Sequence, residues 1–134
     1  MNPPRPAVNT RRGLKRLLAA TGFSLTGIRT AWQSEEAFRQ EAVLALLLLP
    51  TAWWLGTTAV ERLMLAGSVL LVLIVELLNT AVEYTVDRIG TDHHELSGRA
   101  KDIGSAAVLL SLLLWALTWG TIAWTRFFGA AGAL

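Results

Sequence analysis

The chain has 134 residues, of which 53% are hydrophobic and 16% charged, and its formal net charge is +2. This length suits a single domain, but the composition is too apolar for an ordinary soluble protein. The chain has no cysteine, which excludes disulfides, thiolate metal sites and thiol nucleophiles.

The N-terminal region divides into two parts. Residues 1–10 (MNPPRPAVNT) are rich in proline and lack periodicity, so we expect a disordered tail. Beyond them, apolar residues recur at spacings of three and four, which predicts an amphipathic helix over about 12–33 in the membrane interface. A solvated helix packed on another subunit is the alternative, and Gly22 and Gly27 allow a break. The apolar positions are Leu14, Leu17, Leu18, Thr21, Leu25, Ile28 and Trp32.

Three apolar blocks follow, at 42–60, 63–86 and 103–125. Each is long enough, at about 1.5 Å per helical residue, to cross a hydrocarbon core of about 30 Å. A soluble bundle would need a polar face on every helix, and the first and third blocks carry no charge. We therefore expect an all-α membrane protein, a single domain over 11–134 with spans at about 37–57, 61–88 and 103–126.

The distribution of Lys and Arg predicts an orientation. Seven of the twelve precede the first span, and three more lie between the second and third spans. The positive-inside rule then places the N-terminus and the second loop in the cytoplasm and the C-terminus outside. Because the first apolar run begins only at Ala42, we expect no cleavable signal.

One polar stripe runs along the second half of the second span: Glu76, Asn79, Glu83 and Asp87. On a helix they project within a sector of roughly 80°. An ionisable side chain at this depth costs at least roughly 2.5 to 3.5 kcal/mol on insertion scales, which favours a functional role. A protonated carboxylate that joins two helices, one paired with a hidden cation and one that snorkels to the surface are the structural alternatives.

The depth of these carboxylates constrains their chemistry. Glu76 lies towards the cytoplasmic side of the hydrocarbon, where a lipid head group and a water-soluble reagent can both arrive, and suits a proton acceptor. Glu83, closer to water, suits a hard cation, because Mg2+ takes one or two protein carboxylates together with phosphate oxygens. Glu35, Glu36 and Glu41, just before the first span, offer further carboxylates at the same surface.

The segment DRIGTDHHELSGRAKDIGSAAV is expected to form a polar cytoplasmic loop between the second and third spans. Its adjacent histidines and acids allow a zinc site, but they lack the usual ligand spacing. A loop that positions phosphates is favoured. No Walker phosphate-binding loop is present in the sequence, so a nucleotide would be held without one. The charged residues and histidines are Asp92, His93, His94, Glu95, Arg99, Lys101 and Asp102.

Three segments carry a resemblance to a known family. ELLNTAVEYTVD (76–87), AWQSEEAFRQE (31–41) and HELSGRAKDIGSAAV (94–108) resemble, in order and separation, the patterned segments of the small integral-membrane prokaryotic diacylglycerol kinases. The resemblance covers roughly 14–126. It implies transfer of the γ-phosphate of ATP directly to the primary hydroxyl of diacylglycerol, giving phosphatidic acid, in the bacterial inner membrane.

The resemblance also implies the role of each site residue. Glu76 would be the general base, Glu35 and Glu83 would hold Mg2+, and Asn79 would orient Glu76 or the phosphates. Nucleotide contacts would fall on Arg16, Phe23, Glu35, Glu83, Asp92, His93, His94, Lys101 and Asp102. Lipid contacts would fall on Arg29, Trp32, Arg39, Glu41, Trp54, Arg62, Ser105, Trp119 and Trp124.

Self-association is expected on two grounds. Three spans from one chain can hardly enclose a site on all sides, and the resemblance implies a homotrimer with shared sites. The sequence departs from the family pattern at Phe23, where many relatives have tyrosine, at Thr26, which is frequently basic, and at Glu36. The last departure leaves open whether Glu35 or Glu36 reaches the metal.

Other functions are also considered. The nearest is an undecaprenol kinase, which shares the fold and the chemistry but acts on a polyprenyl alcohol. A proton- or cation-translocating protein would use Glu76 and Glu83 as relay stations, but residues 63–75 offer only Ser68 as a polar side chain. A purely structural membrane protein is a third alternative, and no nucleic-acid partner is expected.

Overall fold

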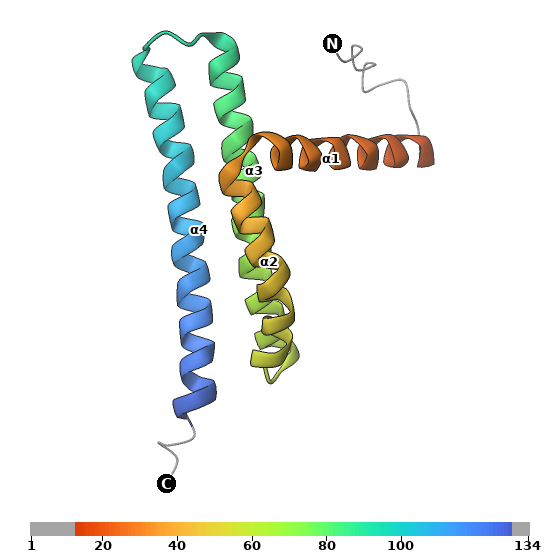
Figure 1. The fold of residues 1–134 in the computed structure, drawn as a ribbon, viewed down its shortest axis with the longest axis vertical. Helices are drawn as coiled ribbons and strands as arrows, with labels where there is room; N and C mark the ends of the chain where they lie inside the picture. Colours follow the sequence, from red (N-terminus) through yellow and green to blue (C-terminus); the bar gives the residue numbers. More distant parts are fainter. Residues whose placement is uncertain (1–12, 130–134) are drawn as a thin grey trace. The chain divides into compact units, whose positions relative to one another are not determined.

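A computed structural model describes residues 13–129, so the expected tail at 1–10 lies outside the described residues. The described chain consists of four helices without a strand: α1 (Leu14–Ser34), α2 (Glu36–Leu55), α3 (Ala59–Ile89) and α4 (Glu95–Phe128) (Figure 1). The expected all-α fold is confirmed. The helices belong to two units, one containing α1 and the other containing α2, α3 and α4.

Helix α1 runs without interruption through Gly22 and Gly27, so the break that these glycines allow does not occur. Its hydroxyl side chains donate to carbonyl oxygens one turn earlier in the same helix, at 2.8 to 3.0 Å. The helix itself therefore satisfies these polar groups, while large apolar side chains such as Leu14, Leu17 and Leu25 are exposed. This is the amphipathic helix that the sequence predicts, and its position in the interface stays a prediction.

In the second unit, α3 is the central helix. It packs along α4 and along α2, whereas α2 and α4 make few contacts with each other. The two connections lie at opposite ends of this unit: α2 joins α3 at one end and α3 joins α4 at the other (Figure 1). We call them the α2–α3 end and the α3–α4 end.

The hydrophobic core lies at the α2–α3 end. Ala52, Leu55, Leu65 and Ile122 are buried together, and the indole of Trp119 packs on them and donates to the Leu65 carbonyl at 3.3 Å. The start of α3 has a capping box: the Glu61 amide donates to the Thr58 hydroxyl at 3.1 Å, and Glu61 accepts from the Thr58 amide at 3.2 Å.

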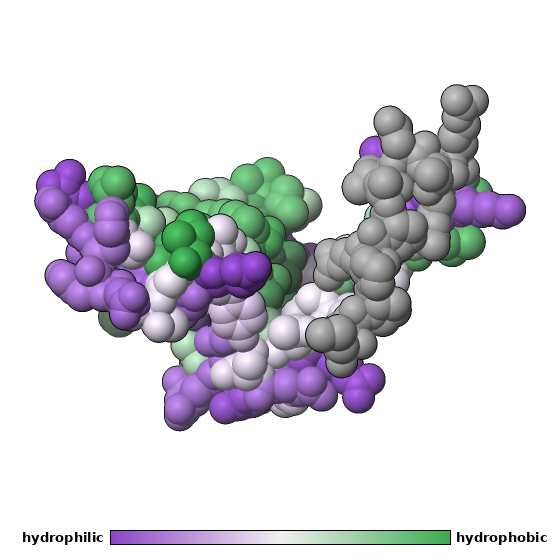
Figure 2. Space-filling view, turned by 90° about the horizontal axis from the view of Figure 1, so that it is seen from above, coloured by the Kyte–Doolittle hydropathy of each residue, from purple (hydrophilic) through white to green (hydrophobic). Residues whose placement is uncertain are grey.

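The α3–α4 end is polar. Figure 2 looks onto this end and shows hydrophilic residues gathered there, with apolar residues on the flank behind them. Helix α4 begins at Glu95, capped by the His94 imidazole, which accepts from the Leu96 amide at 3.2 Å. Glu95, Arg99, Lys101 and Asp102, which the sequence assigns to a loop, therefore lie on the first turns of α4. The apolar pattern begins at about residue 103, later than the helix itself. The sequence pattern therefore does not reveal the first turns of α4.

Helices α3 and α4 are long and apolar enough to cross a membrane. Only 33% of the apolar window of α3 and 11% of that of α4 are buried, so neither resembles the core helix of a soluble protein. The expected first span falls on α2, which is not among the helices that meet this test, and its first turns carry Arg39 and Glu41. A third span therefore stays a prediction.

Candidate active site

The polar stripe of α3 leads from a buried position to the α3–α4 end. Glu76 is buried, with 7% of its surface exposed, Asn79 and Glu83 are half-buried, and Asp87 is exposed. The helical spacing of these residues puts them on one side of α3, as the sequence predicts. A buried carboxylate in an apolar helix requires nearby groups that stabilise it or use it.

Glu76 belongs to a cluster of carboxylates. It interacts electrostatically with Glu83 and Glu35, and Glu41 interacts with Glu76. We call these four residues the carboxylate cluster. Like charges at short range repel, so such a cluster is stabilised by protons or by a cation.

The cluster fits Mg2+ only in combination with a phosphate. The described residues include no group of three or more His, Asp or Glu side chains placed to hold a metal ion by themselves. Mg2+ usually binds one or two protein carboxylates and completes its shell with water and substrate phosphates. Glu35 and Glu83 can supply two such carboxylates, so the donor set fits a metal that arrives with a nucleotide.

Glu35 and Glu36 point to different partners. Glu35 precedes α2, and its carboxylate accepts a hydrogen bond of 2.6 Å from the Tyr84 hydroxyl on α3. The carboxylate of Glu36 accepts instead from the Gln40 amide of its own helix, at 3.2 Å. Of the two, Glu35 is the one bound to the helix that carries Glu76.

Asn79 lies between Glu76 and Glu83 on α3. Its amide nitrogen Nδ2 donates to the Glu83 carboxylate at 3.1 Å. Its oxygen Oδ1 is buried and has no hydrogen-bond partner within the described chain. The geometry therefore connects Asn79 to the expected metal ligand Glu83.

A polar cavity of about 180 Å³ lies at the α3–α4 connection. It brings together four of the expected nucleotide contacts, Asp92, His93, His94 and Lys101, while Asp102 is not among its lining residues. Lys101 donates to Asp87 at 2.7 Å, an exposed ion pair that ties the start of α4 to the end of α3. The His94 imidazole caps α4, and within residues 13–129 no group of three His, Asp or Glu side chains is placed to hold a metal ion.

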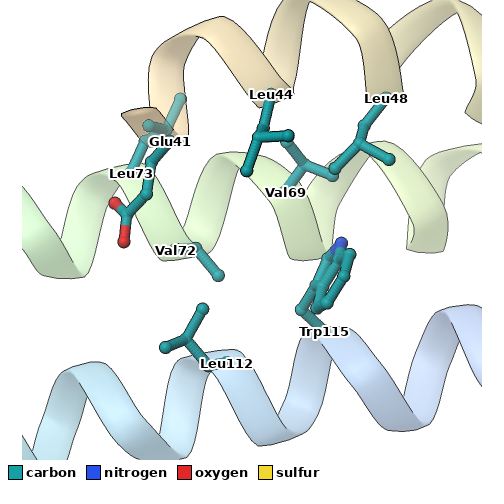
Figure 3. Close-up of a pocket in the computed structure, with 8 residues that line it drawn as sticks. All are labelled: Glu41, Leu44, Leu48, Val69, Val72, Leu73, Leu112 and Trp115. Atoms are coloured by element: carbon teal, nitrogen blue, oxygen red, sulfur yellow. The ribbon is translucent and has the colours of Figure 1, made fainter. Parts of the chain in front are cut away.

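A second, apolar cavity of about 80 Å³ lies among α2, α3 and α4. Figure 3 shows Glu41 at one end of it and Trp115 at the other, with Leu44, Val72 and Leu112 between them. One carboxylate oxygen of Glu41 and the indole nitrogen of Trp115 are buried without a hydrogen-bond partner within the described chain. An apolar cavity with one carboxylate of the cluster, Glu41, at its end is suited to a hydrocarbon chain that carries a polar head group.

The expected lipid contacts of α2 to α4 divide between the two ends. Arg39, Glu41 and Ser105 lie in the part of the helices near the carboxylate cluster. Arg62 lies about 21 Å along α3 from Glu76 by helical rise; it stacks on the Trp53 ring at 4.4 Å and donates to the Gly56 carbonyl at 3.0 Å. Trp54, Trp119 and Trp124 also lie towards that α2–α3 end.

Helix α1 carries the remaining expected residues, Arg16 and Phe23 for the nucleotide and Arg29 and Trp32 for the lipid. All four are exposed within the described chain. Their relation to the carboxylate cluster stays a prediction.

Sequence reasoning missed two residues at the site: Tyr84, which contacts the carboxylate cluster, and Gly104, which contacts Asn79. Tyr84 lies eight residues after Glu76, which turns it about 80° away from Glu76 around α3, and its partner Glu35 is 49 residues away in the chain. Gly104 lies opposite Asn79, where an added Cβ atom would come within 2.2 Å of the Asn79 oxygen. A glycine inside a helix permits such a close approach but does not by itself indicate one, since Gly98 and Gly120 of α4 face open space.

The described helices thus combine two candidate membrane spans with a buried carboxylate, Glu76, and a polar cavity at the α3–α4 connection. Residues 22–123 match the family model of prokaryotic diacylglycerol kinase. The chain is 50% identical over 119 residues to the diacylglycerol kinase of Escherichia coli K12, a match that covers 89% of this chain and 98% of that protein.

Two further relatives agree. The chain is 51% identical over 110 residues to the diacylglycerol kinase of Haemophilus influenzae, which covers 82% of this chain and 93% of that protein. It is 49% identical over 110 residues to that of Pseudomonas aeruginosa, covering 82% and 89%. The chain belongs to the prokaryotic diacylglycerol kinase family, and it is a kinase.

Proposed function

We propose that this kinase phosphorylates diacylglycerol with ATP and Mg2+ in the inner membrane, giving phosphatidic acid and ADP. The observation that carries the proposal is the burial of Glu76 inside an apolar helix, within a cluster of carboxylates. The names of the relatives supply the substrate class, and the cavities supply places for it. The polar cavity suits a nucleotide, and the apolar one suits part of an acyl chain.

Glu76 is the proposed general base. It accepts the proton of the primary hydroxyl, and that oxygen forms a bond to the γ-phosphorus of ATP. The bond between this phosphorus and the bridging oxygen breaks, and its electron pair leaves with ADP. Because phosphoryl transfer depends mainly on alignment and charge neutralisation, Glu76 also positions the hydroxyl in line with the leaving group.

Glu35 and Glu83 are the proposed Mg2+ ligands. These two carboxylates would hold the ion, which would supply positive charge to neutralise the phosphates. The hydrogen bond from Tyr84 supports Glu35 as a ligand, because it holds this carboxylate against α3. The bond from Asn79 supports Glu83 in the same way. Glu36, which is bonded to Gln40, has no such link to α3.

The nucleotide is proposed to lie against the α3–α4 connection. Asp92, His93, His94 and Lys101 line the polar cavity there, and Lys101 adds positive charge near the transferred phosphoryl group. Arg16, Phe23 and Asp102 are further proposed contacts. The positive-inside rule supports a cytoplasmic position for this end, where ATP is available.

The lipid is proposed to approach from the membrane and to contact Arg29, Trp32, Arg39, Glu41, Trp54, Arg62, Ser105, Trp119 and Trp124. Large apolar side chains exposed on α2, α3 and α4, such as Leu46, Leu63 and Leu110, suit lipid or further copies of the chain. We propose a homotrimer with shared sites, which would cover part of this surface.

A relay of protons or cations is less well supported. Ser68, the single polar side chain of residues 63–75, is buried and donates to the Leu65 carbonyl at 2.8 Å. Its hydroxyl is thus used within its own helix, and this half of α3 offers no chain of polar groups to a relay.

The test is a transfer assay on the purified full chain in mixed micelles. Mg-ATP is supplied with dioleoylglycerol or with undecaprenol, and the phosphorylated lipid is quantified. We expect product with dioleoylglycerol and little with undecaprenol. Product with undecaprenol alone would move the substrate to the polyprenyl alcohols, and product with neither lipid would refute the lipid kinase proposal.

A further inference from the structure

Helices α3 and α4 come close together at one glycine. A Cβ atom added to Gly104 would lie 2.2 Å from Oδ1 of Asn79 and 3.3 Å from its Cγ. Real Cβ atoms do not approach other atoms so closely, so the Asn79 carboxamide occupies the space of the missing side chain. The other two glycines of α4, Gly98 and Gly120, would place a Cβ with nothing within 4 Å.

The position of the carboxamide fixes its orientation. Nδ2 donates to the Glu83 carboxylate at 3.1 Å, and Oδ1 faces α4 at Gly104. The reverse orientation would place Oδ1 against the Glu83 carboxylate, where two acceptors repel. The amide nitrogen Nδ2 of Asn79 can therefore donate to Glu83 only if the oxygen Oδ1 occupies the space beside Gly104.

We infer that Gly104 is a positioning residue for phosphoryl transfer, because the space it leaves in α4 lets Asn79 hold Glu83 in place. This inference rests on the proposed role of Glu83 as a Mg2+ ligand. Gly104 has no side chain to bind a ligand, and it acts on Glu83 through the Asn79 carboxamide. Both helices thus determine the position of Glu83. Helix α3 carries Glu83 and Asn79, and α4 leaves room for Asn79 because it has a glycine at position 104.

Gly104→Ala is the variant that tests the inference. Alanine favours the helical backbone more than glycine does, so α4 itself is not weakened. The clash falls on the end of a flexible side chain, and Asn79 is expected to rotate away from Gly104 and from Glu83. A lost hydrogen bond to a charged group corresponds to roughly a tenfold effect or more. We expect a Mg2+ requirement and a metal dissociation constant about tenfold higher.

Two controls separate this role from general packing. Gly120→Ala makes the same chemical change in the same helix, at a site with open space, and should leave metal binding unchanged. Asn79→Ala removes the group that Gly104 accommodates, so Gly104→Ala added to Asn79→Ala should have no further effect. A packing defect, by contrast, would add to the loss caused by Asn79→Ala.

The experiment measures Mn2+ binding to the full-length chain by electron paramagnetic resonance, with a non-hydrolysable ATP analogue, alongside the Mg2+ dependence of turnover. Weaker binding in Gly104→Ala, normal binding in Gly120→Ala and no added loss in the double variant support the inference. Normal binding in Gly104→Ala, equal loss in Gly120→Ala or an additive double variant overturns it.

Two further outcomes are informative. If Gly104→Ala fails to assemble, Asn79→Ala should restore assembly by removing the clashing group, and failure to do so overturns the inference. Glu83→Gln distinguishes the inference from the proposed function. Unchanged Mn2+ binding in Glu83→Gln removes the metal role of Glu83, whereas weaker binding there with normal binding in Gly104→Ala removes only the role of Gly104.

Discussion

The two ends of the α2–α4 unit satisfy their polar groups differently. At the α2–α3 end, Trp119, Glu61 and Arg62 all have hydrogen-bond partners around an apolar core. Nearer the α3–α4 end, Glu41 and Asn79 each keep a buried oxygen without a partner within the described chain, as does the indole nitrogen of Trp115 in the middle of α4. Native proteins rarely leave such groups unpaired, except where a ligand or a catalytic role requires them. We propose on this ground that the first end maintains the fold and that the second binds a ligand.

The largest expected effect comes from Glu76→Gln. Glutamine keeps the size of the side chain but cannot accept the hydroxyl proton, and general-base catalysis contributes about 10² to 10⁴-fold in rate. We expect turnover to fall by that factor, while assembly measured by size-exclusion chromatography is unchanged.

Glu61→Gln is the matched control for Glu76→Gln. Glu61 belongs to the capping box at the α2–α3 end, where glutamine can replace glutamate. Turnover should therefore stay close to that of the unmodified chain. Substantial activity in Glu76→Gln, or a similar loss in Glu61→Gln, would contradict the assignment of the base to the α3–α4 end.

Leu65→Ala tests the opposite side of the comparison. Leu65 is fully buried at 0% exposure in the core of the α2–α3 end. Replacing such a leucine with alanine leaves a cavity, which costs about 2 kcal/mol or more of stability. We expect a lower midpoint of thermal unfolding with nearly normal turnover per folded molecule. Leu63→Ala, at a position that is 73% exposed on the same helix, should change neither. Lost turnover without lost stability would show that this end takes part in catalysis.

Glu35→Gln and Glu36→Gln separate two adjacent carboxylates. Only Glu35 is bonded to α3, so only its loss should raise the Mg2+ concentration required for half-maximal turnover, by roughly tenfold as for a charge-assisted interaction. The measurement is a Mg2+ titration at fixed ATP. A larger shift in Glu36→Gln would assign the metal to the second carboxylate.

Much of the architecture was predictable because it follows from local patterns. The helix expected over about 12–33 corresponds to α1 (Leu14–Ser34), and the one expected over about 61–88 corresponds to α3 (Ala59–Ile89). The start of α4 was missed because its first two turns are stabilised by the His94 cap and the Glu95–Arg99 ion pair rather than by an apolar stripe. Local capping thus extends a helix beyond its hydrophobic pattern.

The site could be predicted only in part. The spacing of Glu76, Asn79 and Glu83 within one helix places them on one side of α3 without any knowledge of packing. The contacts of Tyr84 with Glu35 and of Gly104 with Asn79 join different helices, and they depend on how far each helix is shifted along its neighbour. The pattern of residues within a single helix does not determine how far that helix is displaced along its neighbour.

Tyr84→Phe gives the smallest of the expected effects. It removes the hydroxyl that donates to Glu35 at 2.6 Å and leaves the ring in place. Glu35 keeps its charge and its position before α2, so it loses only one constraint on its orientation. The loss of one hydrogen bond between side chains, worth about 1 kcal/mol, predicts a Mg2+ requirement raised by roughly fivefold, with little change in maximal turnover.

Thr85→Val is the matched control for Tyr84→Phe, because it removes the hydroxyl of the next residue along α3. That hydroxyl donates to the Ala81 carbonyl of its own helix at 2.7 Å, whereas the hydroxyl that donates to Glu35 belongs to Tyr84. Its loss should leave the Mg2+ titration unchanged. If both variants shift the titration equally, the effect belongs to the helix rather than to the bond with Glu35. If neither variant shifts the titration, the hydrogen bond from Tyr84 does not position Glu35 for metal binding. The contrast in polar pairing between the two ends then rests on the unpaired oxygens of Asn79 and Glu41.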